Sequence, residues 1–107
     1  MRPPRKPLST TLVLDEVLDA ASCRAMQRFQ KHARLAPRCD AAIDLRRTRA
    51  TASRPWATLV KIVRDLEYNG HAVTVLAGEG LTRLLEVTGL SRHARIISPR
   101  AVNSQLP

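Results

Sequence analysis

The sequence predicts an α/β fold: a single small domain with a mixed, mostly parallel sheet and helices packed on it. Short segments such as 72–77 (AVTVLA) are almost continuously apolar, which is typical of buried strands. Between such segments, apolar residues recur at three- and four-residue steps, as in amphipathic helices. Because strands that alternate with helices pair in parallel through right-handed crossovers, we expect 40–45 and 72–77 to be neighbouring parallel strands.

The order of the elements follows from these periodicities and from the residues that end helices. Asp19 is the predicted N-cap of the first helix, and Asn69-Gly70 is a strong stop for the second, since either residue accepts a left-handed conformation. The expected order is a strand over 12–14 that continues towards 18, a helix from 19 that ends before Pro37, a strand over 41–45, a helix from about 55 to 68, a strand over 71–77, a helix over 81–87 and a strand over 95–97.

A chain of 107 residues, 44% of them hydrophobic, is long enough for one buried core and too short for two. We expect the domain to cover residues 11–98, with a basic, proline-rich arm over 1–10 and a polar tail over 99–107. No apolar run approaches the roughly 18 residues that cross a bilayer, and the N-terminus does not resemble a secretory signal. These features predict a cytoplasmic protein, in which Cys23 and Cys39 are thiols; a disulfide between them is the alternative.

The formal net charge of +9 comes from 18 basic and 9 acidic residues, and most of the basic ones are arginine. Arginine is suited to bidentate contacts with carboxylates and phosphates. The excess is concentrated in residues 1–7 and in a second segment that contains Arg46, Arg47, Arg49 and Arg54. An acidic protein partner, a nucleic acid and a merely solvated surface each fit this pattern. The low aromatic content of 3% argues against stacking on single-stranded nucleic acid.

Residues with a catalytic role are scarce in this sequence. His32, His71 and His93 are scattered and belong to no metal-binding or nucleophile motif. The segment Gly78 to Gly80 is followed by neither a Walker lysine nor a dinucleotide fingerprint, so we interpret it as a turn. The sequence therefore predicts a protein that is not an enzyme, with no catalytic residue, no cofactor and no metal site.

Four segments together carry a resemblance to a known family. Ile43-Asp44-Leu45 ends a predicted strand, Asn69-Gly70 ends a helix, Leu85 to Leu90 read LEVTGL, and Val17 to Ala21 read VLDAA at the start of the first helix. In this order and spacing, over about 12–97, they resemble the STAS domain, the fold of bacterial anti-sigma-factor antagonists. The resemblance implies a small α/β domain that binds proteins.

The chain departs from the family pattern at the turn that precedes the second helix. In place of Asp-Ser-Ser-Gly it reads Ala52-Ser53-Arg54-Pro55, so Ser53 falls on the serine that is phosphorylated in the antagonists. Pro55 is expected to open the helix, Arg54 to be its cap, and Ser53 to lie just outside it in an exposed loop. Further departures are Glu16 in place of glycine, and a first strand that is shortened or missing.

In the family, the unmodified antagonist captures an anti-sigma factor, usually a serine kinase, and phosphorylation of the serine blocks that capture. The resemblance therefore implies a protein-binding regulator whose phosphoacceptor candidate is Ser53. Trp56 is either an exposed anchor of the interface or, from its spacing, a core residue. Two alternatives stay open: a STAS subunit or scaffold bound to a cytoplasmic transporter ATPase component, and a basic nucleic-acid-binding module. The candidate partner-binding residues are Arg46, Arg47, Arg49, Thr51, Arg54 and Trp56.

Overall fold

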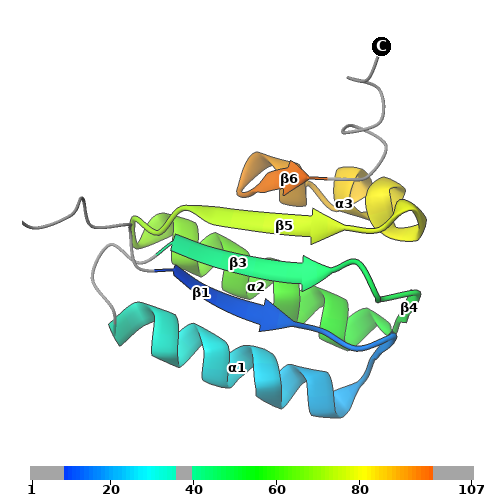
Figure 1. Cartoon of the computed structure of the whole chain (residues 1–107), viewed down its shortest axis with the longest axis horizontal. Helices are drawn as coiled ribbons and strands as arrows, with labels where there is room; N and C mark the ends of the chain where they lie inside the picture. The colour runs from blue at the N-terminus through cyan, green and yellow to red at the C-terminus, as the bar shows by residue number, and fades with distance from the viewer. Residues whose placement is uncertain (1–8, 36–39, 98–107) are drawn as a thin grey trace, which may run out of the picture.

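A computed structural model describes residues 9–35 and 40–97 of the chain (Figure 1). Four strands form one sheet, and every pairing between them is parallel. The predicted fold class, a small α/β domain with a mostly parallel sheet, is confirmed. In the order in which they neighbour one another, the strands are β1 (Ser9–Val13), β3 (Asp40–Leu45), β5 (Val73–Ala77) and β6 (Arg95–Ile97).

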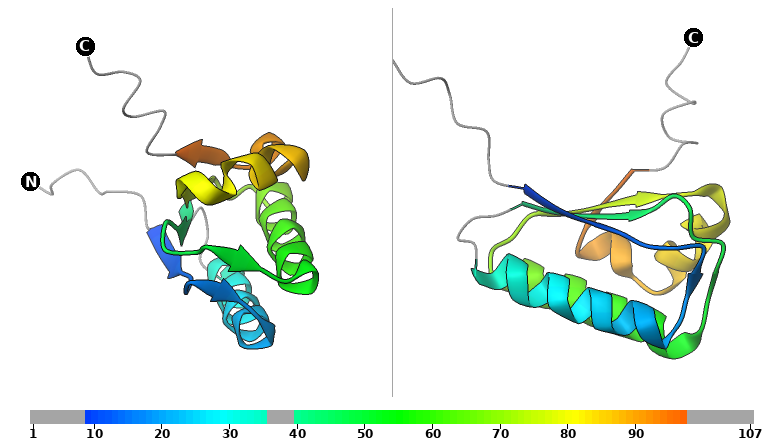
Figure 2. Two further views of the ribbon diagram at one scale, coloured as in Figure 1. Left: turned by 90° about the vertical axis from the view of Figure 1, so that its right-hand side faces the viewer. Right: turned by 60° about the horizontal axis from the view of Figure 1, so that its bottom comes forward.

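The two long helices, α1 (Ala20–Leu35) and α2 (Ser53–Tyr68), lie side by side against the same face of the sheet (Figure 2). The short helix α3 (Thr82–Val87) follows β5 and contributes Leu85 to the same core. Two short 3-10 helices flank α3: η1 (Glu79–Leu81) and η2 (Leu90–Arg92). Because side chains alternate across a strand, every second residue of β3 and β5 points into the core. These buried residues are Ala41, Ile43, Leu45, Val73, Val75 and Ala77.

The central pairing of the prediction is confirmed, since β3 and β5 are parallel neighbours joined through α2. Ile43 lies opposite Val75 in the register, and both are fully buried. α2 packs beneath this pair with its own apolar stripe, which includes Leu59 and Leu66. The stripe exists because apolar residues recur at helical spacing, and burying it is what holds the helix on the sheet.

The start of α1 is capped by Asp19 as the sequence indicates, and Ser22 adds a second capping bond. Asp19 Oδ1 accepts hydrogen bonds from the backbone N–H groups of Ala21 (3.0 Å) and Ser22 (3.2 Å). In return, the Ser22 hydroxyl oxygen accepts a bond from the Asp19 N–H at 3.0 Å. This reciprocal arrangement satisfies three donors that the helix itself cannot, as in a capping box.

The predicted stop of α2 at Asn69-Gly70 is also confirmed. Gly70 adopts a left-handed conformation with φ of +87°, which costs glycine little. Its N–H donates to the Glu67 carbonyl oxygen, and the His71 N–H donates to the Leu66 carbonyl oxygen, both at 3.0 Å. These two bonds form a Schellman motif, which turns the chain back into β5.

The expected boundary between arm and domain is two residues too late. β1 begins at Ser9, and its register places Ser9 opposite Asp40 and Thr10 opposite Ala41. Threonine suits a pleated strand, so the strand begins with these polar residues and extends into the apolar residues that follow. The remaining arm, the tail over 99–107, Cys39 and any additional first strand lie outside the described residues.

Both long helices have 16 residues. None of the helices in the described ranges has the length and apolar character that would be needed to span a membrane.

Candidate functional site

The turn that leads into α2 is fixed to the turn that leads into α1. β2 (Val17–Leu18) and β4 (Ala50–Thr51) form a short parallel pair beyond the carboxyl ends of β1 and β3. The Glu16 carbonyl oxygen accepts bonds from the N–H groups of Arg49 (2.7 Å) and Ala50 (3.2 Å). The Ala52 N–H donates to the Leu18 carbonyl oxygen at 3.2 Å. The backbone before Ser53 is therefore held in one conformation.

A buried threonine, Thr48, links the loops that lead into β2 and β4. Thr48 is 4% exposed, and its hydroxyl donates to the Asp15 carbonyl oxygen at 2.7 Å. Leu18, which is fully buried, anchors β2 in the core. A buried hydroxyl without a partner would be costly, so this bond ties the two loops together as well as satisfying the side chain. Thr48 cannot be recognised as such a residue from the sequence, because nothing local marks it as buried.

Ser53 is the first residue of α2, and Ala52 is its N-cap, with φ of −77° and ψ of 161°. The Trp56 N–H donates to the Ala52 carbonyl oxygen at 3.3 Å, which is the first bond of the helix. The expectations that Arg54 caps the helix and that Pro55 opens it are therefore wrong. Pro55 occupies the third helical position, where its missing N–H removes no intrahelical bond and its ring meets no preceding turn.

The N-terminus of α2 has no side-chain cap. The side chain of Ala52 offers no acceptor, and no acidic residue lies in the first turn. Within the described ranges, the N–H groups of Ser53 and Arg54 have no hydrogen-bond acceptor. The side chains of Ala52, Ser53 and Arg54 are all exposed. An exposed hydroxyl therefore lies at the positive end of a helix dipole, where a phosphate would be accommodated electrostatically.

Arg46 is bound to Asp44 of its own chain, which the sequence alone does not indicate. Its Nε and Nη2 atoms donate to the two carboxylate oxygens of Asp44 at 3.0 and 2.8 Å. Its backbone N–H also donates to Asp44 Oδ1 at 3.0 Å. These bonds lower the pKa of Asp44, against the opposing effect of its burial, and raise the pKa of Arg46. The guanidinium fork is thus occupied by its own chain.

The remaining partner-binding candidates lie in two places: near the start of α2, and in the loop between β3 and β4. Arg54 follows Ser53 on the first turn of α2, and Thr51 is half-buried next to it, with its hydroxyl donating to the Ala52 carbonyl oxygen at 2.9 Å. Arg49 is exposed in the loop between β3 and β4. Arg47 instead lines a second pocket of about 440 Å³, formed by the loop between β1 and α1. No ion pair of these three arginines occurs in the described part of the chain.

Trp56 is 6% exposed and belongs to the core, so the interpretation as an exposed anchor is wrong and the alternative of burial holds. Its indole nitrogen is nevertheless buried with no hydrogen-bond partner among the residues that the structure describes. A buried N–H without an acceptor costs about 1 to 3 kcal/mol. Most such groups in native proteins have a partner, so this donor needs a physical explanation.

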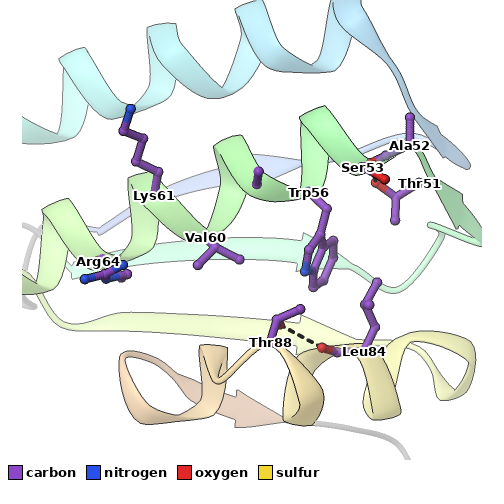
Figure 3. Close-up of a pocket in the computed structure, with 10 residues that line it drawn as sticks. Thr51, Ala52, Ser53, Trp56, Val60, Lys61, Arg64, Leu84 and Thr88 are labelled. Atoms are coloured by element: carbon purple, nitrogen blue, oxygen red, sulfur yellow. Dashed lines mark hydrogen bonds between the residues drawn. The ribbon is translucent and has the colours of Figure 1, made fainter.

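The ring of Trp56 forms part of the wall of a pocket of about 560 Å³ that opens between α2 and α3 (Figure 3). The helix α2 supplies most of the lining, and α3 with the residue after it supplies the opposite side. The lining residues are Thr51, Ala52, Ser53, Trp56, Ala57, Val60, Lys61, Arg64, Leu84 and Thr88. Beyond Trp56, none of these lining residues is a site residue predicted from the sequence except Thr51 and Ser53, although Ala57, Lys61 and Arg64 recur at helical spacing on one face of α2.

Within residues 9–35 and 40–97, no group of three or more histidine, cysteine, aspartate or glutamate side chains is arranged to hold a metal ion. His93 contacts Glu67 through Nδ1 at 3.2 Å, which ties the segment before β6 to the end of α2. His32 is exposed on α1, and His71 is buried where the chain enters β5. The three histidines lie on separate elements and form no joint site.

No protein-family model matches the sequence, and no curated protein matches it either.

Proposed function

We propose that this chain is a protein-binding regulator of the anti-sigma-factor-antagonist type. It binds an anti-sigma factor, or the serine kinase that serves as one, through the turn that opens α2 and the outer face of that helix. One observation carries the proposal: the Ser53 hydroxyl is exposed at the first position of a 16-residue helix, in a turn held by the β2–β4 pair. A contact surface that phosphorylation regulates needs an accessible hydroxyl on a backbone held in place, and this turn has both.

The charge around Ser53 favours an acidic partner. Arg54 is exposed directly after it, Arg49 is exposed in the loop before β4, and the first turn of α2 contains no acidic residue. The chain as a whole carries a formal net charge of +9. Such a surface steers an acidic partner into encounter and contributes more to the association rate than to final affinity. Arg46 contributes less, because Asp44 neutralises it.

Phosphorylation of Ser53 acts on the complex more than on the fold. A phosphate adds about −1.5 to −2 charges, and the N-terminus of α2 with Arg54 tolerates it in the free protein. In the complex the same phosphate must lose water and approach an acidic surface, and both effects oppose docking. Modification of Ser53 therefore releases the partner without unfolding the regulator.

The experiment begins with the tagged chain, which is used to isolate its partner from the host cell. The proposal requires that the captured protein be an anti-sigma factor or a kinase with a histidine-kinase-like ATPase domain. Calorimetric titration then compares the wild type with Ser53→Asp and Ser53→Ala. We expect Ser53→Asp to bind more weakly, since it adds charge at the contact, and Ser53→Ala to bind as the wild type does.

A matched control separates the contact from a general effect of charge. Ser91 is exposed in η2, outside this turn, so Ser91→Asp adds the same charge and should leave partner affinity unchanged. Ser53→Asp should also raise the unfolding free energy by about 0.3 to 1 kcal/mol, because it complements the dipole of α2. Equal affinities for Ser53→Asp and the wild type would show that this turn is no charge switch.

The nucleic-acid alternative gives a different result in the same assay. Binding that neutralises phosphates weakens by roughly three to five powers of ten between about 50 and 200 mM salt when many contacts are involved. A packed protein interface weakens much less over that range. Capture of nucleic acid with such a salt dependence, in place of a protein, would refute the proposed function.

A further inference from the structure

The indole N–H of Trp56 is the strongest sign of a ligand site in the described part of the chain. Trp56 is 94% buried, and its nitrogen has no hydrogen-bond acceptor. In Figure 3 the edge of the ring that carries the nitrogen faces the side of the pocket where Val60 and Arg64 lie. An acceptor placed there by a ligand would satisfy a donor that the described protein does not.

The pocket next to this nitrogen has the size and composition of a small-molecule site. Its volume of about 560 Å³ lies within the range of about 300 to 1,000 Å³ that is typical of such sites. Its walls are apolar at Trp56, Ala57, Val60 and Leu84. The hydroxyl groups of Thr51, Ser53 and Thr88 interrupt these apolar walls, as polar groups do in sites that orient a ligand.

The charge of the pocket has a single sign. Lys61 and Arg64 are the charged residues of its lining, and no aspartate or glutamate is among the residues that line it. At the other end lies the uncapped N-terminus of α2, roughly 16 Å from Arg64 by the rise of a helix. Both ends therefore attract negative charge, while the middle favours an apolar body.

We infer that the pocket between α2 and α3 binds a small amphipathic carboxylate or a similar organic anion. The anionic group lies between the Trp56 nitrogen and Arg64, accepts a hydrogen bond from the indole N–H, and is paired by the Arg64 guanidinium. The apolar body rests on the Trp56 ring, Ala57 and Leu84. A ligand reaches the covered nitrogen only after a small rotation of the ring or of a neighbouring side chain, so the indole N–H reports directly on a seated ligand.

This inference does not rest on the proposed function, because the ligand is measured without any protein partner. Trp56 is the single tryptophan of the chain, so a ¹⁵N-labelled sample gives one indole N–H signal. Decanoate is the probe, and 1-decanol, which has the same chain without the charge, is its neutral counterpart. We expect decanoate to move the indole signal downfield in a saturable way and 1-decanol to bind at least several-fold more weakly.

Paired variants test the charged groups without disturbing the core. Arg64→Ala removes the cation at the pocket and should weaken decanoate binding by about three- to tenfold. Arg28→Ala removes an exposed arginine from α1, outside the pocket, and should leave binding unchanged. Lys61→Ala should weaken binding less than Arg64→Ala does, because the Lys61 side chain points away from Leu84 and Thr88 in Figure 3.

Three results would overturn the inference. The first is an indole signal that does not move, or does not saturate, with decanoate. The second is equal binding of decanoate and 1-decanol, or equal loss in Arg64→Ala and Arg28→Ala, since either shows non-specific hydrophobic adsorption. The third is an indole signal that responds only to a protein partner, which would make the pocket part of a protein interface.

Discussion

Because the N-terminus of α2 has no side-chain cap, a capping residue at position 52 should stabilise the protein. Ala52 is the N-cap residue, has φ and ψ suited to that position, and is exposed. Serine at such a position accepts a hydrogen bond from the N–H of the second or third helical residue. Here the third residue is Pro55, which has no N–H, so only the Arg54 N–H can be satisfied.

The expected gain follows from that count of donors. Replacing alanine by a capping residue typically gives about 0.5 to 2 kcal/mol. Because a single donor is available, we expect Ala52→Ser to raise the unfolding free energy by about 0.5 to 1 kcal/mol, or the melting temperature by about 3 to 6 °C. Ala52→Asp also adds a negative charge at the positive end of the helix dipole. At low salt it should raise the unfolding free energy by a further amount of about 0.3 to 1 kcal/mol.

Urea denaturation followed by circular dichroism measures these differences. The control is Ala57→Ser, the same substitution at an exposed interior position of α2, where serine cannot cap. It should lower stability by about 0.5 kcal/mol, since serine has the weaker helix propensity. The excess of Ala52→Asp over Ala52→Ser should disappear in about 1 M salt, where charges are screened beyond about 3 Å. If Ala52→Ser is no more stable than the wild type, Ser53 is not the first helical residue and the geometry of the site is wrong.

Two further predictions concern the loop beside this turn. A Cβ on Gly78 would lie 3.0 Å from the Arg46 carbonyl oxygen, so Gly78→Ala should cost about 1 to 3 kcal/mol in thermal unfolding, whereas Gly80→Ala, with no atom within 4 Å of its Cβ, should be close to neutral. Asp44→Asn should cost about 1 kcal/mol at pH 7, a modest value because the Arg46 side chain is 61% exposed. The hydrogen bond from Arg46 lowers the pKa of folded Asp44, so its contribution is present above the ordinary aspartate pKa of 3.8 and is lost as the pH falls through the lower folded pKa. A difference between Asp44→Asn and the wild type that persisted unchanged below that range would contradict this assignment.

The predictions that the structure confirms depend on short-range physics. The cap at Asp19 and the stop at Asn69-Gly70 follow from backbone geometry and from which side chains accept a bond. The start of α2 could not be placed in the same way. Proline is compatible with several positions in the first turn, and the choice among them depends on the β2–β4 pair, whose bond from Ala52 to Leu18 positions the turn.

The candidate site was only partly accessible to sequence reasoning. Ser53 was located correctly as the exposed hydroxyl of this turn, although its place in the helix was not. The sequence does not predict the pairing of Arg46 with Asp44, since residues two apart in a regular strand do not usually form such a pair, and here the chain turns at the end of β3. The sequence allows two interpretations of Trp56, because its spacing fits both a core stripe and an interface, and only its burial decides between them.

The sequence by itself determined the α/β order, the central β3–α2–β5 unit and the ends of α1 and α2, because periodicity and capping are local properties of the chain. Tertiary structure alone decided that α3 faces α2 across a pocket, that Thr48 binds a loop 33 residues away, and that the Trp56 nitrogen is buried without an acceptor. Each of these features joins residues that are distant in sequence or depends on what surrounds a side chain. Such relations arise only when the helices pack on the sheet, since no pattern within a single segment encodes its neighbours.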